Sequence, residues 1–151
     1  MKKQTRLCKK SPHTLLFAAL CACSFPSYAT ELIIKIQGLK NADGQLVAFL
    51  FANANKEKFP TDISAADCTT KAPASTQAIE LTCSNVTPGT YAVFAFHDRN
   101  NNGTLDHSFI GMPKEPLGFS SGCKATFGPP KFDKCKFDVG ESTTEVVVSI
   151  K

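Results

Sequence analysis

Two short stretches decide the fold class of this chain: LVAFLF at residues 46–51 and YAVFAF at residues 91–96. Each is apolar at every position, so it has no polar face to turn toward water. Such runs are typical of strands that are buried on both faces. We therefore expect two central strands, each packed between a core on one face and a covering loop on the other.

The segments around these runs alternate instead of being apolar throughout. Apolar residues recur at every second position in three further stretches: Leu32, Ile34 and Ile36; Ile79, Leu81 and Cys83; Val146, Val148 and Ile150. A period of two, not 3.6, predicts strands and not helices. Leu46, Ala48 and Leu50 follow the same period within the first central run.

Turn residues separate the expected strands. Asn41-Ala42-Asp43-Gly44 predicts a hairpin turn between the first two strands, with Gly44 at positive φ. Thr87-Pro88-Gly89 predicts a similar turn before Tyr91. Two connections are much longer, at residues 52–78 and 98–134, and loops of that length in a small domain are usually functional or covalently tied.

The N-terminal segment has the pattern of a secretory signal peptide. Residues 1–13 hold five basic residues and no acid, and the apolar run TLLFAALCAC and the small-residue site Ser27-Tyr28-Ala29 follow. We expect cleavage after Ala29, so that residues 1–29 form the signal and residues 30–151 a single domain in the periplasm or secreted medium. No run approaches the ~20 apolar residues of a transmembrane helix, so no membrane span is expected.

A lipoprotein is the alternative interpretation of this segment. Leu20-Cys21-Ala22-Cys23 would then be the lipobox, and Cys23 would carry the lipid. Cys at the second position of such a box is unusual, and the site at Ala29 is a good one for ordinary cleavage.

The charge of the chain depends on this cleavage. The precursor has 17 Lys and Arg against 13 Asp and Glu, a formal charge of +4, but five of the basic residues lie in the signal. The remainder is close to neutral, at −1, and slightly acidic. It therefore gives no support for binding nucleic acid or an anionic membrane.

Four of the seven cysteines lie beyond the signal: Cys68, Cys83, Cys123 and Cys135. An even number in a small exported domain predicts two disulfides. Of the three possible pairings, Cys68 with Cys83 and Cys123 with Cys135 is favoured, because each pair brackets one compact segment. Zinc is a weaker alternative, since the chain has no Cys-x-x-Cys and His97 and His107 are not spaced like finger ligands.

Short strands, frequent turns and paired cysteines together predict an all-β fold. We expect an antiparallel β-sandwich of immunoglobulin-like or transthyretin-like type, with two long disulfide-tied loops.

The second long loop begins with the sequence DRNNNGTLD, which resembles a calcium-binding loop. Positions 1, 3, 5, 6, 7 and 9 of that motif fall on Asp98, Asn100, Asn102, Gly103, Thr104 and Asp106. Alternate side-chain oxygens would converge on one ion, the Gly would make the sharp turn, and the Thr carbonyl would add an oxygen. Position 12 holds Phe109 in place of the usual Glu, so Glu115 would have to complete the site.

Other interpretations of this loop stay open. It is also explained as an Asn-rich turn without any ion, or as a transition-metal site using His97, Asp98, His107 or Glu115. The second half of the loop is expected to fold back over the sheet, with Phe109 and Phe119 inserted into the sandwich.

The pentapeptide GFSSG at residues 118–122 matches the Gly-x-Ser-x-Gly nucleophile motif by letter. That motif needs a strand before it and a helix after it, whereas this one lies in a Gly- and Pro-rich loop. A hydrolase using Ser120 is therefore the least favoured function, and a non-enzymatic role is preferred. As candidate ligand-binding residues we take His97, His107, Phe119 and Ser120.

A longer stretch, TPGTYAVFAFHDRNNNGTLDHSFIGMPKEPLGFS followed by GPPKFDKCKF, resembles the signature of the exported bacterial family called domain of unknown function 2141. The resemblance covers nearly all of residues 30–151. It implies an envelope protein with an immunoglobulin-like or transthyretin-like sandwich, and it implies no activity. The four cysteines are not part of the family pattern.

These observations favour an exported, non-enzymatic binding module. Its loop from Asp98 to Ser120, ordered by calcium, would present a surface to a protein or a small ligand in the cell envelope. The alternative is a purely structural envelope protein without a bound ion.

Overall fold

The computed structural model describes residues 29–126 and 128–151. The predicted signal up to residue 28, including Cys23, lies outside the described residues. The described chain forms eight strands and four short helical turns: β1 (Thr30–Gln37), β2 (Gln45–Ala52), η1 (Asn53–Asn55), η2 (Ile63–Ala65), β3 (Cys68–Pro73), β4 (Ile79–Val86), β5 (Gly89–Asp98), β6 (Leu117–Phe119), η3 (Ser120–Gly122), α1 (Phe132–Cys135), β7 (Phe137–Val139) and β8 (Thr144–Ser149).

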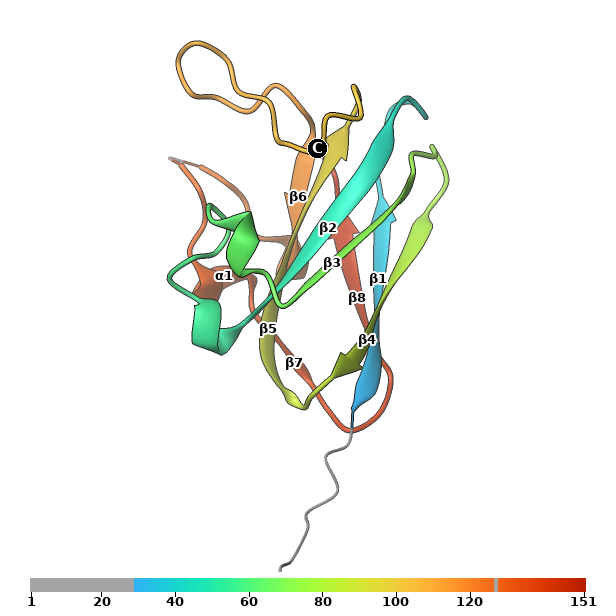
Figure 1. Ribbon diagram of the computed structural model, residues 1–151, viewed down its shortest axis with the longest axis vertical. Helices are drawn as coiled ribbons and strands as arrows, with labels where there is room; N and C mark the ends of the chain where they lie inside the picture. Colours follow the sequence, from blue (N-terminus) through green and yellow to red (C-terminus); the bar gives the residue numbers. More distant parts are fainter. Residues whose placement is uncertain (1–28, 127) are drawn as a thin grey trace, which may run out of the picture.

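The strands form two sheets that pack face to face (Figure 1). The smaller sheet has the order β4-β1-β8, and the larger has the order β3-β2-β5-β6, with β7 pairing the other end of β5. All pairs are antiparallel except β1 with β8, which is parallel. The predicted all-β, mainly antiparallel sandwich is confirmed, with one parallel pair where β8 fills the edge of β1 that β4 leaves open.

Strands β2 and β5 are buried on both faces, as their uninterrupted apolar sequences predict. One face of each contributes to the core between the sheets, through Leu46, Ala48, Leu50, Tyr91, Val93 and Ala95. The opposite face forms a second, aromatic cluster with residues of the long loops: Phe49, Phe51, Phe94 and Phe96 pack with Phe59, Phe119 and Phe132. The face of the larger sheet that points away from the smaller sheet is thus covered by the long loops.

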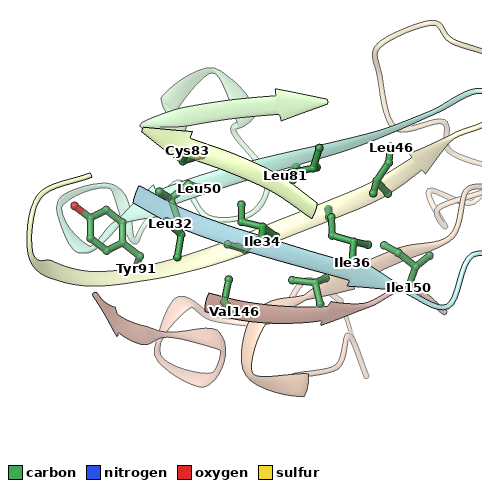
Figure 2. Close-up of a cluster of buried hydrophobic side chains, with 14 of the residues drawn as sticks. Leu32, Ile34, Ile36, Leu46, Leu50, Leu81, Cys83, Tyr91, Val146 and Ile150 are labelled. Atoms are coloured by element: carbon green, nitrogen blue, oxygen red, sulfur yellow. The ribbon is translucent and has the colours of Figure 1, made fainter. Parts of the chain in front are cut away.

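Figure 2 shows the core between the sheets, where the alternating residues of β1 and β8 face β2 and β5. Leu32, Ile34 and Ile36 of β1 are completely buried. Fully burying a side chain of this size stabilises a fold by about 1.5–3 kcal/mol. The alternating strand β1 therefore packs its apolar side against the apolar face of β2 and β5.

The two predicted turns, at residues 41–44 and 87–89, do not form the hairpins that were expected. The connection from β1 to β2 and that from β4 to β5 each cross from one sheet to the other, so neither is a hairpin. Gly44 does have a positive φ, of 72°, and a side chain there would collide with the backbone of Arg99. Gly89 does not adopt the left-handed conformation, so that prediction was wrong.

The long connection at residues 52–78 contains a strand that the sequence did not reveal. Strand β3 lies at the edge of the larger sheet and pairs only with β2 among the described strands. Its residues alternate between half-buried and exposed, and its sequence CTTKAP has few large apolar side chains. An edge strand of this kind lacks the apolar signal that identifies buried strands.

Both predicted disulfides are present. Cys68 of β3 is bonded to Cys83 of β4, which links the two sheets, with a Cα–Cα distance of 6.2 Å. Cys123, just after η3, is bonded to Cys135 of α1, with a Cα–Cα distance of 5.3 Å. Within residues 29–126 and 128–151, no helix has the length and apolar character needed to cross a membrane.

Candidate binding site

The candidate site is built on the loop of residues 99–116, which leaves the sheet at the end of β5 and returns in β6. The two strands are paired directly below the loop, with Phe96 opposite Leu117. The N–H of His97 donates to the carbonyl of Pro116 at 2.8 Å and continues this pairing by one residue. The ends of the loop are therefore fixed by the sheet itself, and Figure 1 shows the loop projecting from one end of the sandwich.

Asp98, the last residue of β5, organises the first turn of the loop. Its side chain is completely buried. One carboxylate oxygen accepts the N–H of Gly103 at 2.8 Å and the side-chain amide of Gln45 at 2.7 Å, while the other accepts the N–H of Asn102 at 3.1 Å. Positive φ at Asn101 and Gly103 brings these N–H groups round to face the carboxylate.

These contacts change the acidity of Asp98. Burial by itself raises the pKa of the carboxyl group, because it disfavours the charged form. Hydrogen bonds from the Gln45 side chain and from the backbone of Gly103, Asn102 and Asn101 favour the carboxylate and outweigh that effect. The net pKa of Asp98 therefore lies below its ordinary value, and the group is an anion at neutral pH.

A second buried carboxylate, Glu115, holds the other half of the loop. One of its oxygens accepts the N–H of Arg99 at 2.9 Å, and the other accepts the N–H of Asp106 at 3.2 Å. Glu115 is only 6% exposed. It therefore ties the return path of the loop to its start and to its middle, which is the inward position expected for this residue.

The remaining residues of the calcium-like motif contact one another. The amide NH₂ groups of Asn100 and Asn102 donate to the two carboxylate oxygens of Asp106, at 2.7 and 3.0 Å. The side-chain oxygen of Asn102 accepts both the N–H and the hydroxyl of Thr104. The loop thus brings together all six predicted metal ligands, but it joins them by hydrogen bonds. Among the described residues, no three His, Cys, Asp or Glu side chains cluster closely enough to hold a metal ion.

Two of the candidate ligand-binding residues are buried and bonded to the backbone. The ring of His97 is 1% exposed, and its Nε2 donates to the carbonyl of Asp43 at 2.6 Å. The hydroxyl of Ser120 is fully buried, donates to the carbonyl of Cys135 at 2.6 Å and accepts the N–H of Val93 at 2.8 Å. Both side chains thus join separate segments of the fold and face away from solvent.

The far part of the loop, residues 106–114, is a small hairpin. The N–H of Lys114 donates to the carbonyl of Asp106, and that of Ser108 donates to the carbonyl of Met112. Gly111, at φ 79°, closes the turn by donating its N–H to the carbonyl of Ser108. Phe109 is fully exposed at this turn, so the expectation that it inserts into the sandwich was wrong; Phe119 is buried as expected.

A cavity of about 660 Å³ lies between this hairpin and two other parts of the chain, which contribute Pro60, Thr61 and Ile63, and Ala125, Thr126, Gly128 and Pro129. Its lining includes Phe94 and Phe119, whose rings stack with a centroid distance of 5.4 Å. The hairpin adds residues 111–113 and His107. Its volume lies within the usual range of small-molecule sites, about 300–1,000 Å³.

The described lining of this cavity contains no Lys, Arg, Asp or Glu. Its apolar members include Ile63, Leu105, Met112 and Leu117, and its polar members are His107 and three Thr residues. A charged ligand placed here would lose water without gaining an opposite charge, which is unfavourable. The lining is therefore chemically suited to neutral, mostly apolar molecules with a few hydrogen-bonding groups.

Residues 34–147 match the family described as uncharacterized protein conserved in bacteria (DUF2141). The chain belongs to this family. The DUF2141 match spans the whole loop, both disulfides and every described residue of the cavity lining, and it confirms the resemblance drawn from the sequence. Comparison with curated proteins and with solved structures finds no match.

Three of the predicted site residues line the cavity: His107 and Phe119, predicted to bind a ligand, and Thr104, predicted to bind a metal. Sequence reasoning missed the rest of the lining. Leu105 and Met112 stand out as apolar residues within a polar loop, and this was the available signal. Ile63 and Ala125 come from segments that are distant in sequence, and only folding brings them to the same wall.

Proposed function

We propose that this DUF2141 protein is an exported binding module that holds a small, neutral, mostly apolar ligand in the cavity beneath the loop of residues 99–116. The observation that carries this proposal is the lining of the cavity, whose described residues include two stacked Phe rings and no Lys, Arg, Asp or Glu. Buried apolar surface supplies affinity, and a few polar groups such as His107 supply orientation.

The loop supports this role because it is a rigid wall. Asp98 and Glu115 hold its backbone from inside, through N–H groups at residues 99, 102, 103 and 106. No buried side-chain nitrogen or oxygen of the described residues lacks a hydrogen-bond partner. A wall fixed in this way costs little ordering entropy when a ligand binds.

Calcium belongs to this proposal as an additional ligand of the loop. Asp106 supports it, because its carboxylate is only half buried and its partners are the side chains of Asn100 and Asn102. Rotation of those two amides would turn their oxygens toward a cation beside Asp106. With so few carboxylates, the affinity would be in the millimolar to submillimolar range of extracellular modules, about 0.1–1 mM.

An enzymatic role is disfavoured by the surroundings of Ser120. Its hydroxyl is fully buried, and both its donor and its acceptor capacity are used by backbone groups. A serine nucleophile needs a base within hydrogen-bond reach and access to substrate. A purely structural envelope protein is the alternative, and it predicts no saturable ligand binding.

Titration with N-phenyl-1-naphthylamine, a neutral fluorescent probe of apolar sites, tests the ligand proposal. We expect saturable binding of one probe per chain. Ala125→Trp, which fills the cavity, and Leu105→Glu, which adds a charge to a partly buried position of its wall, should each weaken binding about tenfold or more. Val147→Glu, on an exposed site of β8 outside the cavity lining, is the control. Binding that is equal in all four proteins would contradict the proposal.

We further infer that the protein acts in the periplasm or in the medium. Two disulfides support this, since they persist in oxidising compartments. The intact mass of protein recovered from the host should match a chain that begins at Thr30 with four oxidised cysteines. A lipid-modified chain that begins at Cys23 would instead establish the lipoprotein alternative.

A further inference from the structure

We propose that the hairpin tip at residues 108–112 docks this protein onto an anionic lipid bilayer. The proposal adds a membrane-surface role to the binding of a small ligand. It rests on the shape, exposure and charge of the tip. Only the final step, in which the ligand comes from the bilayer, depends on the proposed function.

Exposed apolar side chains are concentrated at this tip. The described chain has four large apolar residues that are highly exposed, and three of them lie within four consecutive positions: Phe109 at 105%, Ile110 at 75% and Met112 at 61%. The fourth is Val147 on β8, at 52%. Scattered apolar residues on a surface need no explanation, but a contiguous group marks a contact site.

The tip has a defined conformation. Ser108 receives the N–H of Gly111 on its backbone carbonyl at 2.9 Å and the N–H of Met112 on its hydroxyl at 3.1 Å. Below the turn, the hairpin is fixed by the pair between Asp106 and Lys114 and by the buried Glu115. The apolar side chains are therefore held outward at the end of a supported structure.

The shape of the tip suits a bilayer better than a protein partner. Figure 1 shows the loop projecting from the end of the sandwich opposite the start of β1. A stable protein interface buries about 800 Å² on each partner, more than three side chains on a convex turn present. Insertion of Phe, Ile and Met into the headgroup boundary requires no complementary surface.

The two charged side chains that stand exposed beside the tip are positive, whereas the acids of the loop are buried or half-buried. Arg99 and Lys114 are both exposed, and the guanidinium of Arg99 donates to the carbonyl of Lys114 at 3.0 Å, which places the arginine along the hairpin. The acids Asp98 and Glu115 are buried and face backbone N–H groups. The half-buried carboxylate of Asp106 accepts the side-chain amides of Asn100 and Asn102. The formal charge of −1 for residues 30–151 conceals this local arrangement, which favours anionic headgroups.

The tip and the cavity share residues. Gly111 and Met112 belong to the turn and also line the cavity. A tip inserted into a bilayer would bring the cavity to the membrane surface, where neutral apolar molecules concentrate. This continuity explains why a ligand pocket and an apolar protrusion occur on the same loop.

Intrinsic fluorescence offers a direct test, because the chain contains no Trp. In Phe109→Trp, vesicles of phosphatidylglycerol and phosphatidylcholine should shift the emission to shorter wavelength, and brominated lipids should quench it. Val147→Trp is the matched control and should respond to neither. An unchanged spectrum for Phe109→Trp would overturn the proposal and favour a protein partner.

Cosedimentation with the same vesicles gives the energetics. The double substitution Phe109→Ser and Ile110→Ser should lower the partition constant about tenfold or more and leave the melting temperature unchanged, since both side chains are exposed. Arg99→Gln with Lys114→Gln should remove the preference for anionic over zwitterionic vesicles and the sensitivity to salt. Equal sedimentation of all variants would contradict the proposal. Binding of the naphthylamine probe without vesicles separates this outcome from failure of the ligand pocket.

Discussion

The carboxylate of Glu115 accepts the backbone N–H of Arg99 at 2.9 Å, and this contact joins the two ends of the loop that carries the candidate site. Its second oxygen reaches the N–H of Asp106 in the same loop. One buried side chain thereby holds the start, the middle and the end of a loop that has little regular secondary structure of its own.

Replacing Glu115 should therefore loosen the loop more than the sandwich. Glu115→Ala leaves two backbone N–H groups without their acceptor, and we expect a loss of about 1–3 kcal/mol in the free energy of unfolding. Amide hydrogen exchange should increase at residues 99–116 and stay unchanged in β1 and β8. Glu145→Ala, which removes a half-exposed carboxylate paired with Lys35, should cost at most about 1 kcal/mol. Equal effects of the two substitutions would show that Glu115 does not hold the loop.

Asp98 should make the stability of the protein depend on pH. Its pKa is lowered in the folded state, so its contribution is fully present above the pKa of the unfolded chain, near pH 4. That contribution is lost as pH falls through the folded pKa. The difference in unfolding free energy between the unmodified protein and Asp98→Asn should be constant from pH 5 to 7 and should shrink below about pH 4. A difference that is independent of pH down to pH 2 would show that the ionised form is not favoured by folding.

Calcium should raise the melting temperature if the loop takes up an ion as proposed. With a dissociation constant of about 0.1–1 mM, 10 mM calcium stabilises the fold by about 1.4–2.7 kcal/mol. Asp106→Asn should abolish this shift and lower the stability in chelator by only about 1 kcal/mol, because it loses one exposed amide contact to Asn100 or Asn102 but keeps the backbone contact to Glu115. Magnesium at the same concentration is the control for ionic strength. No response to calcium would mean that the loop is an Asn-rich structural turn.

The two disulfides should contribute similar amounts to the free energy of unfolding, but they hold different parts of the fold. They close loops of 15 and 12 residues, for which chain entropy predicts about 2–4 kcal/mol each. Loss of the Cys68–Cys83 bond, through paired Ala substitutions, should free the edge strand β3 from β4. Loss of the Cys123–Cys135 bond should instead loosen the segment that forms one wall of the cavity, so probe binding should weaken only in the second variant. Weakened binding in both would indicate that the cavity depends on the whole sandwich.

Much of the scaffold follows from local patterns in the sequence. Alternation at every second residue identified β1, β4 and β8, and the unbroken apolar runs identified β2 and β5 as strands covered on both sides. These patterns are reliable because the side chains of a strand point alternately to its two faces. The order of apolar and polar residues therefore indicates which face of the strand is buried. The even number of cysteines and their spacing also anticipated the two bonds that form.

The site was predicted only in part, since its contacts depend on how distant segments meet. The motif at Asp98 indicated a turn with converging polar groups, and Glu115 was expected to approach it. The sequence did not show that both carboxylates would be occupied by backbone N–H groups, or that Phe109 would stand in solvent.

What the sequence by itself determined is the all-β class, the two doubly covered strands and the polar loop, because each depends on neighbours along the chain. It favoured, among three possible pairings, the cysteine pairing that forms. Tertiary structure alone decided the edge strand β3, the crossing of β1–β2 and β4–β5 between sheets, and the cavity with its described lining free of Lys, Arg, Asp and Glu. Those features depend on which surfaces meet after the chain closes. Residues such as Ile63 and Ala125 carry no local signal that they will share a wall, and only the packing against the aromatic face of the larger sheet brings them together.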